Sequence, residues 1–289
     1  MPEFADLLAV RTTRPDAIAE ASAARRRPTS LFGSHGKMMI IAADHPARGA
    51  LRAGADPLAM ANRVDLLDRL RTALARPGVN GVLGTPDILE DLLLLGALED
   101  KVVIGSMNRG GLAGTTFEMD DRFTAYDAGS IAAAGLEGGK MLLRIDPADA
   151  GTVATLAACG TAVTELAAHR RMAMVEPFIS HRVDGRVRND LTAEAMIRAM
   201  TVAAGLGTTS AYTWLKVPVV PDMERVMAAT TLPALILGGE VSDDASGAYA
   251  QWAKALSQPT VQGLVIGRSL LYPANGGVAD AVDRAVGLL

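Results

Sequence analysis

Short apolar runs alternate with longer segments of helical periodicity along this chain. Runs that are apolar throughout, without polar alternation, indicate parallel strands that helices cover. Eight such runs predict strands, at Met38–Ala43, Val79–Leu83, Val102–Ser106, Gly139–Ile145, Met172–Val175, Ala211–Lys216, Ala234–Leu237 and Leu264–Ile266. The helical patterns that follow them lie at Pro57–Ala75, Pro86–Leu95, Asp120–Ala134, Ala148–His169, Thr192–Leu206, Pro221–Ala229, Asp243–Leu256 and Val278–Val286. Several begin with Pro, Asp or Thr, which are common at helix starts.

Eight strand–helix units in roughly 250 residues predict an α/β fold, a (β/α)8 TIM barrel. The rival is a doubly wound open sheet, but no G-x-G-x-x-G pattern follows the first strand, and eight parallel strands in one domain favour closure. We expect a single barrel domain at 38–289, preceded by an N-terminal helical extension at 1–37. Its helix, predicted at Pro15–Arg26, would lie across or beside the barrel.

Composition limits the possible partners. The 289 residues are 49% hydrophobic and carry a net charge of −4, so the chain can bury a sizeable core but has no basic surface suited to nucleic acid or an anionic membrane. The single cysteine, Cys159, excludes an intramolecular disulfide and is expected to be a small buried residue of its helix. The acidic start lacks the apolar run of a signal peptide, and the longest leucine cluster is too short to span a membrane.

We therefore expect a cytoplasmic protein. The Ala, Leu and Met residues on the predicted helices would suit a homo-oligomer, although they suit packing against the barrel equally well.

Lys216 is the most informative residue, because it ends the apolar run of the sixth predicted strand. The chain holds only five lysines, against 23 arginines. A buried amine is costly since desolvation penalises its ammonium form, and a desolvated amine is what Schiff-base chemistry requires. The alternative is a lysine with a purely structural role.

Side-chain alternation along strands brings further candidates to the catalytic end of such a barrel, where the carboxyl ends of the strands meet. Asp44 lies at the end of the first strand on the same face as Met38, and Glu176 lies at the end of the fifth on the same face as Met172. Both would converge with Lys216 if all three faces point inward. Asp44 could instead cap a turn, and Glu176, which precedes a proline, could be a solvated loop residue.

The fourth strand carries two more candidates on one face, Lys140 and Arg144. Lys140 lies early in the strand and reaches the catalytic end only if its side chain points upward or the strand begins earlier; it could also be half of a structural ion pair. Arg144 lies at the right height to bind a substrate.

No metal centre is expected. The four histidines, His35, His45, His169 and His181, are scattered, and the chain has no H-x-x-x-H or paired-Cys spacing. We likewise expect no organic cofactor.

Six segments, in order, resemble the class I aldolase superfamily, the group of tagatose-bisphosphate, deoxyribose-phosphate and archaeal-type fructose-bisphosphate aldolases. They are Ala42–His45 with Arg48–Gly49, Gly139–Arg144, Val175–Pro177, Leu215–Pro218, Leu237–Gly239 with Val241–Ser242, and Gly267–Arg268. The resemblance extends from about Met38 to Pro273 and implies the same barrel. It implies catalytic roles for Lys216, Glu176, Lys140 and Asp44, and phosphate binding by Gly238, Gly239, Gly267 and Arg268. Glycine permits the close backbone approach that a phosphate site needs.

The implied activity is cleavage of a phosphorylated keto-sugar or keto-sugar acid through a lysine Schiff base, with release of dihydroxyacetone phosphate. The chain as a whole resembles actinobacterial aldolases of inositol catabolism, whose substrate would be 5-dehydro-2-deoxygluconate 6-phosphate. Two alternatives stay open. One is a thiolase-like acyl transfer to coenzyme A through a lysine enamine, and the other is a non-catalytic barrel that binds a sugar phosphate.

Overall fold

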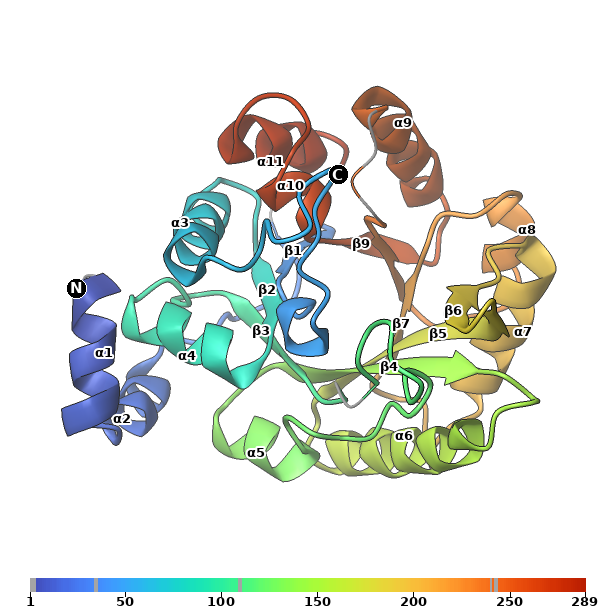
Figure 1. Ribbon diagram of the computed structural model, residues 1–289, viewed down its shortest axis with the longest axis horizontal. Coiled ribbons are helices and arrows are strands. Elements are labelled where there is room, and N and C mark those ends of the chain that lie inside the picture. The colour runs from blue at the N-terminus through green and yellow to red at the C-terminus, as the bar shows by residue number, and fades with distance from the viewer. Residues whose placement is uncertain (1–3, 34–35, 109–110, 240, 242–243) are drawn as a thin grey trace.

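A closed barrel of eight parallel strands forms the centre of the protein (Figure 1). The computed structural model describes residues 4–33, 36–108, 111–239, 241 and 244–289. The barrel strands are β1 (Met38–Ala42), β2 (Gly81–Gly84), β3 (Val102–Ser106), β4 (Gly138–Ile145), β5 (Met172–Val183), β7 (Thr213–Val217), β8 (Ala234–Leu237) and β9 (Val261–Ile266). They pair in chain order, and β9 closes the barrel against β1. The predicted (β/α)8 fold is confirmed, and each predicted strand overlaps one of these.

Two apolar layers hold the barrel together. The inner layer fills the barrel and draws on alternate residues of the strands, namely Met38, Ile40, Ala42, Leu83, Val102, Ile104, Met172, Met174, Leu235 and Val265. The outer layer lies between the strands and the surrounding helices and is much larger. Because both faces of each strand are buried, the strands have the uninterrupted apolar character that parallel sheets show.

The helices surround the barrel (Figure 1). They are α3 (Arg63–Leu74), α4 (Pro86–Leu94), α5 (Ala128–Ala133), α6 (Gly151–Ala168), α7 (Ala193–Ala204), α8 (Met223–Met227), α9 (Ala245–Leu256), α10 (Arg268–Leu271) and α11 (Val278–Val286). A 3-10 turn, η1, lies at Pro46–Arg48. The short α10 was not predicted. The predicted helix start at Asp243 lies outside the described residues, as does His35.

The helix predicted at Asp120–Ala134 is wrong over its first half. Residues 111–127 contain no helix, and α5 begins only where Asp127 accepts a hydrogen bond from the backbone N–H of Ser130 in a capping box. Asp121, within the segment predicted as helix, is buried and forms an ion pair with Arg144. The long connection after β3 is therefore a loop, and it lies over the carboxyl end of the barrel.

A β-hairpin at the same end was also missed. β5 continues past Pro177 to Val183, and β6 (Arg186–Asn189) folds back against it in antiparallel pairing. The turn between them places Asp184 and Gly185 at φ angles of 50° and 75°. Two consecutive left-handed residues make the turn that suits a tight hairpin, and Asp-Gly is a preferred pair for it.

The N-terminal extension lies beside the barrel, next to α4, and contains two helices where one was predicted (Figure 1). They are α1 (Phe4–Thr13) and α2 (Ala17–Ala24). Beyond α2, Leu31 packs against the inner apolar layer, and the ring of Phe32 lies 6.1 Å from that of Trp214. This segment therefore closes the end of the barrel opposite the site.

One helix, α6, is long and apolar enough to cross a membrane by length and composition alone. It packs against β4 and β5, with Cys159, Val163 and Leu166 buried beneath it. Cys159 is thus the buried residue expected, and burial raises the pKa of its thiol to about 12.

A buried ion pair fixes the N-terminal extension to the barrel. Arg25 donates to Glu137 at 3.1 Å, and the Glu137 carboxylate also accepts from Arg27 and from the backbone N–H of Val103. The side chains of Arg25 and Glu137 are only 2% and 5% exposed. Removing one partner leaves a buried charge without compensation.

We expect Glu137→Ala to lower the free energy of unfolding by about 3–5 kcal/mol, because it strands the Arg25 guanidinium. Urea denaturation followed by circular dichroism measures this. The matched control is Glu99→Ala, which removes an exposed partner of Arg26 and should cost about 1 kcal/mol or less. Equal losses in the two variants would show that the buried pair does not anchor the extension.

Candidate active site

Three charged residues meet at the carboxyl end of the barrel. Asp44 follows β1 on the face of Ile40 and Ala42, and Glu176 and Lys216 continue the inward faces of β5 and β7. The faces compared in the sequence therefore do point inward, and the three side chains converge. The backbone of Lys140 lies further inside the barrel, in register with Ser106 of β3. Its long side chain extends toward the carboxyl end and reaches Glu176.

These four residues form a chain of alternating charge. Lys216 Nζ donates to Glu176 Oε1 at 2.7 Å, Lys140 Nζ lies 2.5 Å from Glu176 Oε2, and Lys140 Nζ donates to Asp44 Oδ2 at 3.1 Å. Ser106 Oγ also donates to Asp44 Oδ2, at 3.3 Å. All four charged residues are buried. One carboxylate, Glu176, is therefore shared by two ammonium groups.

The pKa of Lys216 is lowered from the ordinary lysine value. Burial is the main cause, because it penalises the ammonium form. The neighbouring Lys140 ammonium lowers the pKa further by like-charge repulsion, while Glu176 and Asp44 oppose both effects. The amine is therefore easier to deprotonate than that of a surface lysine.

Glu176 shows the opposite balance. Burial alone would raise the pKa of its carboxyl group, but the charges of Lys140 and Lys216 outweigh this and lower the pKa to about 2. At neutral pH Glu176 is a carboxylate, so it can accept a proton from either lysine or from a bound ligand before it can donate one.

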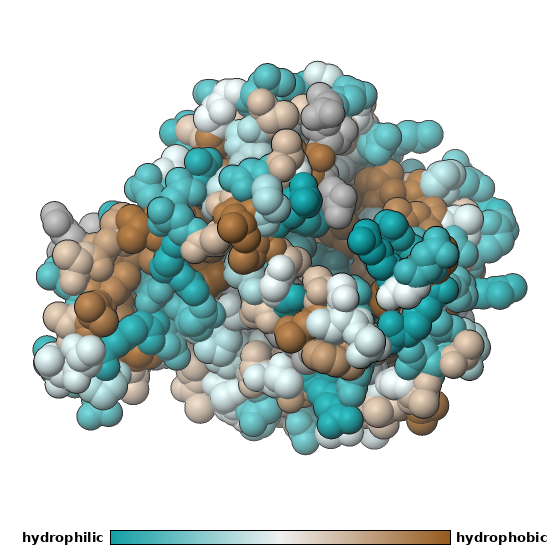
Figure 2. Space-filling view, in the orientation of Figure 1, coloured by the Kyte–Doolittle hydropathy of each residue, from teal (hydrophilic) through white to brown (hydrophobic). Residues whose placement is uncertain are grey.

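A cavity of about 520 Å³ opens above these residues. All nine residues selected from the sequence line it, and Figure 2 shows a hollow on this face with hydrophilic side chains on part of its rim. Among the residues that the structure describes, the lining contains six basic side chains and three carboxylates. The basic ones are Arg48, Lys140, Arg144, Arg188, Lys216 and Arg268, and the acidic ones are Asp44, Glu118 and Glu176. In a chain of net charge −4, this local excess of positive charge favours an anionic ligand.

One side of the cavity is formed by the loops after β8 and β9, which carry Gly238, Gly239, Gly267 and Arg268. Gly239 has a φ of +70°, which disfavours other residues. A Cβ atom on Gly267 would collide with the carbonyl oxygen of Ala42. Both glycines are therefore required by the backbone path, and their small size leaves main-chain groups accessible to a ligand.

Arg144 lies in the cavity wall but is already bound by protein groups. Its guanidinium donates two hydrogen bonds to the Asp121 carboxylate, at 2.7 and 2.8 Å. It also donates to the side chain and to the backbone carbonyl oxygen of Glu118. Arg48 donates to the carbonyl oxygen of Gly111 at 2.8 Å. Arg144 and Arg48 thus hold the loop after β3 over the site, and substrate binding by Arg144 stays a prediction.

The hairpin supplies lining residues that the sequence analysis did not select, namely Val187, Arg188 and Asn189. The Asp184–Gly185 pair between two short alternating runs was the signal for this hairpin. Phe178 and Leu191 add apolar surface on the same side.

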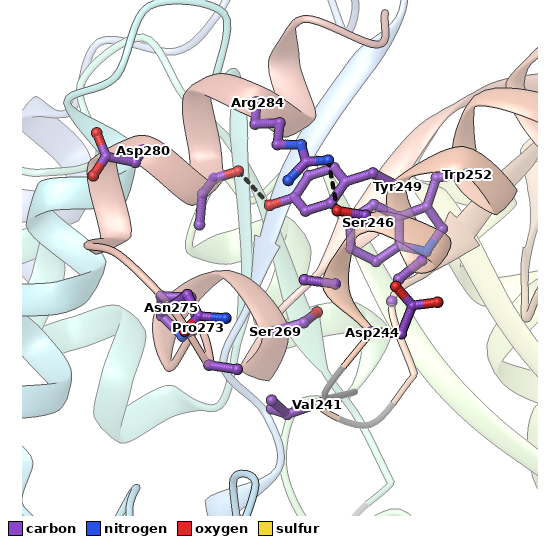
Figure 3. A pocket seen from close by; sticks show the side chains of 15 residues that line it. Val241, Asp244, Ser246, Tyr249, Trp252, Ser269, Pro273, Asn275, Asp280 and Arg284 are labelled. Atoms are coloured by element: carbon purple, nitrogen blue, oxygen red, sulfur yellow. Dashed lines mark hydrogen bonds between the residues drawn. The ribbon is translucent and has the colours of Figure 1, made fainter.

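A second cavity, of about 260 Å³, lies behind the loop after β8, between α9, α10 and α11 (Figure 3). Gly238 lines both cavities. Tyr249 donates to the carbonyl oxygen of Ala281 at 2.8 Å, and Arg284 stacks on the Tyr249 ring and donates to Ser246. These contacts join α9 to α11 on the far side of this second cavity.

Within the described ranges, no group of three or more His, Cys, Asp or Glu side chains is arranged to hold a metal ion. His45 lies beside Asp44, with 3.7 Å between Nδ1 and Oδ1, while His181 lies on β5 opposite Arg188 and has its Nδ1 3.7 Å from Asp146 Oδ1. The expectation of a metal-independent site stays a prediction.

Comparison with known proteins places this site in context. A crystal structure of Cgl0159 from Corynebacterium glutamicum shares 53% identity over 99% of this chain and 96% of its own, with a TM-score of 0.96. An archaeal fructose-1,6-bisphosphate aldolase with its catalytic lysine bound to a carbinolamine intermediate shares 18% identity over 94% of this chain and 97% of its own (TM-score 0.63). Fructose-bisphosphate aldolase from Slackia heliotrinireducens shares 16% over 95% and 83% (TM-score 0.64).

The two aldolases are similar in fold, at identities too low to transfer an activity. None of the curated proteins matches this chain. The model of the Cgl0159-like family matches residues 36–286, which is nearly the whole barrel. Together with the 53% identity to Cgl0159 itself, this match shows that the chain belongs to the Cgl0159-like family.

Proposed function

We propose that this protein is a class I aldolase that cleaves a phosphorylated keto-sugar or keto-sugar acid through a Schiff base on Lys216. The observation that carries the proposal is a buried amine of lowered pKa at the wall of a cation-rich cavity, within 2.7 Å of a carboxylate. The same fold in an aldolase whose catalytic lysine is bound to a carbinolamine supports it.

The chemistry begins with a neutral amine. An unperturbed lysine of pKa about 10.4 is neutral in only about one molecule in 2,500 at pH 7, so lowering the pKa raises the reactive fraction. Lys216 attacks the substrate ketone to give a carbinolamine, and loss of water gives an iminium ion. The bond between the α-carbon and the β-carbon of the iminium then breaks. Its electron pair moves toward the iminium nitrogen to form an enamine, and the β-carbon leaves as part of an aldehyde. The resulting enamine is protonated on carbon, and water releases the second product and the free amine.

Glu176 is the proposed proton acceptor and donor. Its oxygens reach both lysines, and it is ionised at neutral pH, so it can take the proton of the hydroxyl group whose carbon becomes the aldehyde. It can return a proton during loss of water from the carbinolamine. Lys140 keeps the site positive, and Asp44 holds Lys140 in place or binds a substrate hydroxyl.

The excess of cationic groups supports a phosphorylated substrate. Backbone N–H groups of Gly238, Gly239 and Gly267, with Arg268, would bind the phosphate on one side of Lys216. The specific substrate proposed is 5-dehydro-2-deoxygluconate 6-phosphate, with dihydroxyacetone phosphate as one product. This choice rests on the resemblance to aldolases of inositol catabolism.

Borohydride trapping tests the Schiff base. With dihydroxyacetone phosphate or a substrate ketose, we expect borohydride to leave a stable adduct on Lys216, located by peptide mass mapping. Lys216→Met should abolish the adduct and lower turnover by at least a thousandfold while ligand binding persists, since only the nucleophile is lost. The matched control, Lys254→Met at an exposed position of α9, should behave like the wild type.

Turnover retained in Lys216→Met would remove the proposed mechanism. Binding without any adduct would favour a non-catalytic barrel, and turnover that requires coenzyme A would favour acyl transfer. Inhibition by EDTA would point to metal-dependent chemistry.

Lys140→Met tests the electrostatic control of Lys216. Removing the Lys140 ammonium removes a charge that lowers the pKa of Lys216, so that pKa should rise and the neutral fraction at a given pH should fall. We expect the rise of the trapping rate with pH to move to higher pH. Trapping rates with dihydroxyacetone phosphate across pH 5–10 measure this. An unchanged midpoint, or one at lower pH, would contradict it.

A further inference from the structure

Arg188 differs from three arginines nearby, Arg48, Arg144 and Arg182, in having no carboxylate partner among the described residues. Arg48 and Arg144 both lie near Glu118, and Arg182 contacts Asp149. Arg188 is exposed, lines the cavity, and makes no ion pair or side-chain hydrogen bond with any other residue that the structure describes. It is a cation at the cavity mouth whose charge no carboxylate in the described part of the chain neutralises.

The hairpin that carries Arg188 is fixed at its base. Ser180 Oγ donates to Asn189 Oδ1 at 2.8 Å, joining its two strands. Arg182 donates to the carbonyl oxygen of Thr116 at 2.6 Å and to Asp149 at 3.3 Å, which holds the hairpin to its neighbours. Arg188 therefore projects from a supported element, and a ligand need not order the backbone to reach it.

The strand order sets where Arg188 lies relative to the reacting amine. Around the barrel, β5 is followed by β7, then β8 and β9. Lys216 on β7 therefore lies between the hairpin that extends β5 and the glycine loops after β8 and β9. A ligand whose carbonyl carbon sits at Lys216 can place one end at the glycine loops and the other toward Arg188.

We propose that Arg188 binds a second anionic group of the substrate, at the end remote from the phosphate held by the glycine loops. This inference rests on the function proposed above and narrows the substrate to ketoses with an anion at both ends. The group is a carboxylate or a second phosphate, both of which match the planar fork of a guanidinium. Arg188 is then a specificity-determining residue, and it takes no part in the bond-making steps.

The test compares Arg188→Ala with the wild type in borohydride trapping, using three probes. Dihydroxyacetone phosphate carries one anionic end, fructose 1,6-bisphosphate carries two phosphates, and 5-dehydro-2-deoxygluconate 6-phosphate carries a carboxylate and a phosphate. We expect the half-saturating concentration of a probe charged at both ends to rise about tenfold, as loss of a charged hydrogen bond predicts. That of dihydroxyacetone phosphate should not change. In turnover, KM should rise with little change in kcat.

The matched control is Arg186→Ala, which removes the same charge from the same strand at a residue outside the cavity lining. It should leave all three probes unaffected, and Arg188→Lys should restore part of the affinity. The probe that the wild type prefers distinguishes a carboxylate from a second phosphate.

Two failures are distinguishable. If the wild type forms an adduct on Lys216 but Arg188→Ala traps every probe at the same concentrations, the role of Arg188 is overturned and the Schiff-base proposal stands. If affinity falls equally for dihydroxyacetone phosphate, Arg188 acts on the general field of the cavity and not on a second anion. If the wild type forms no adduct with any probe, both proposals fall.

Discussion

The shared carboxylate of Glu176 is the interaction on which the site depends. A lone ammonium buried at the position of Lys216 would cost several kcal/mol in desolvation, and two close together would add mutual repulsion. Glu176 reaches both lysines, and Asp44 reaches Lys140, so charges of opposite sign alternate through the site. The arrangement can be buried at the end of the barrel because each charge has a neighbour of the opposite sign.

The compensation is incomplete at Lys216, and this matters for reactivity. A lysine with a carboxylate of its own in a dry site would be held in the ammonium form. Here Lys216 shares its carboxylate with Lys140, and burial still dominates, so the pKa of Lys216 is lowered in spite of the contact at 2.7 Å. The cavity on its open side gives a carbonyl access to the same nitrogen. Lys216 can therefore form an ion pair with Glu176 and still meet the requirement of the proposed mechanism for a nucleophilic amine.

Much of this site could be predicted because barrel strands are regular. The two-residue alternation fixes which side chains point inward, so Asp44, Glu176 and Lys216 could be aligned from the sequence once the strands were found. The position of the Lys140 amine could not be predicted in this way, because it depends on how a long flexible side chain crosses the barrel interior. The pairing of Arg144 with Asp121 was equally hidden, since Asp121 lies in a loop that the periodicity mistook for helix.

The parts that were missed share one physical cause. The β5–β6 hairpin and the loop after β3 take their shapes from turn chemistry and from contacts distant in sequence, such as Arg182 with the carbonyl of Thr116. Hydrophobic periodicity reports the burial of apolar side chains, and these segments bury few of them. In a barrel the strand ends carry the reacting groups while the loops set what can enter. The sequence pattern therefore points to the chemistry more readily than to the substrate, because the residue proposed to select the substrate, Arg188, lies in a hairpin that hydrophobic periodicity does not reveal.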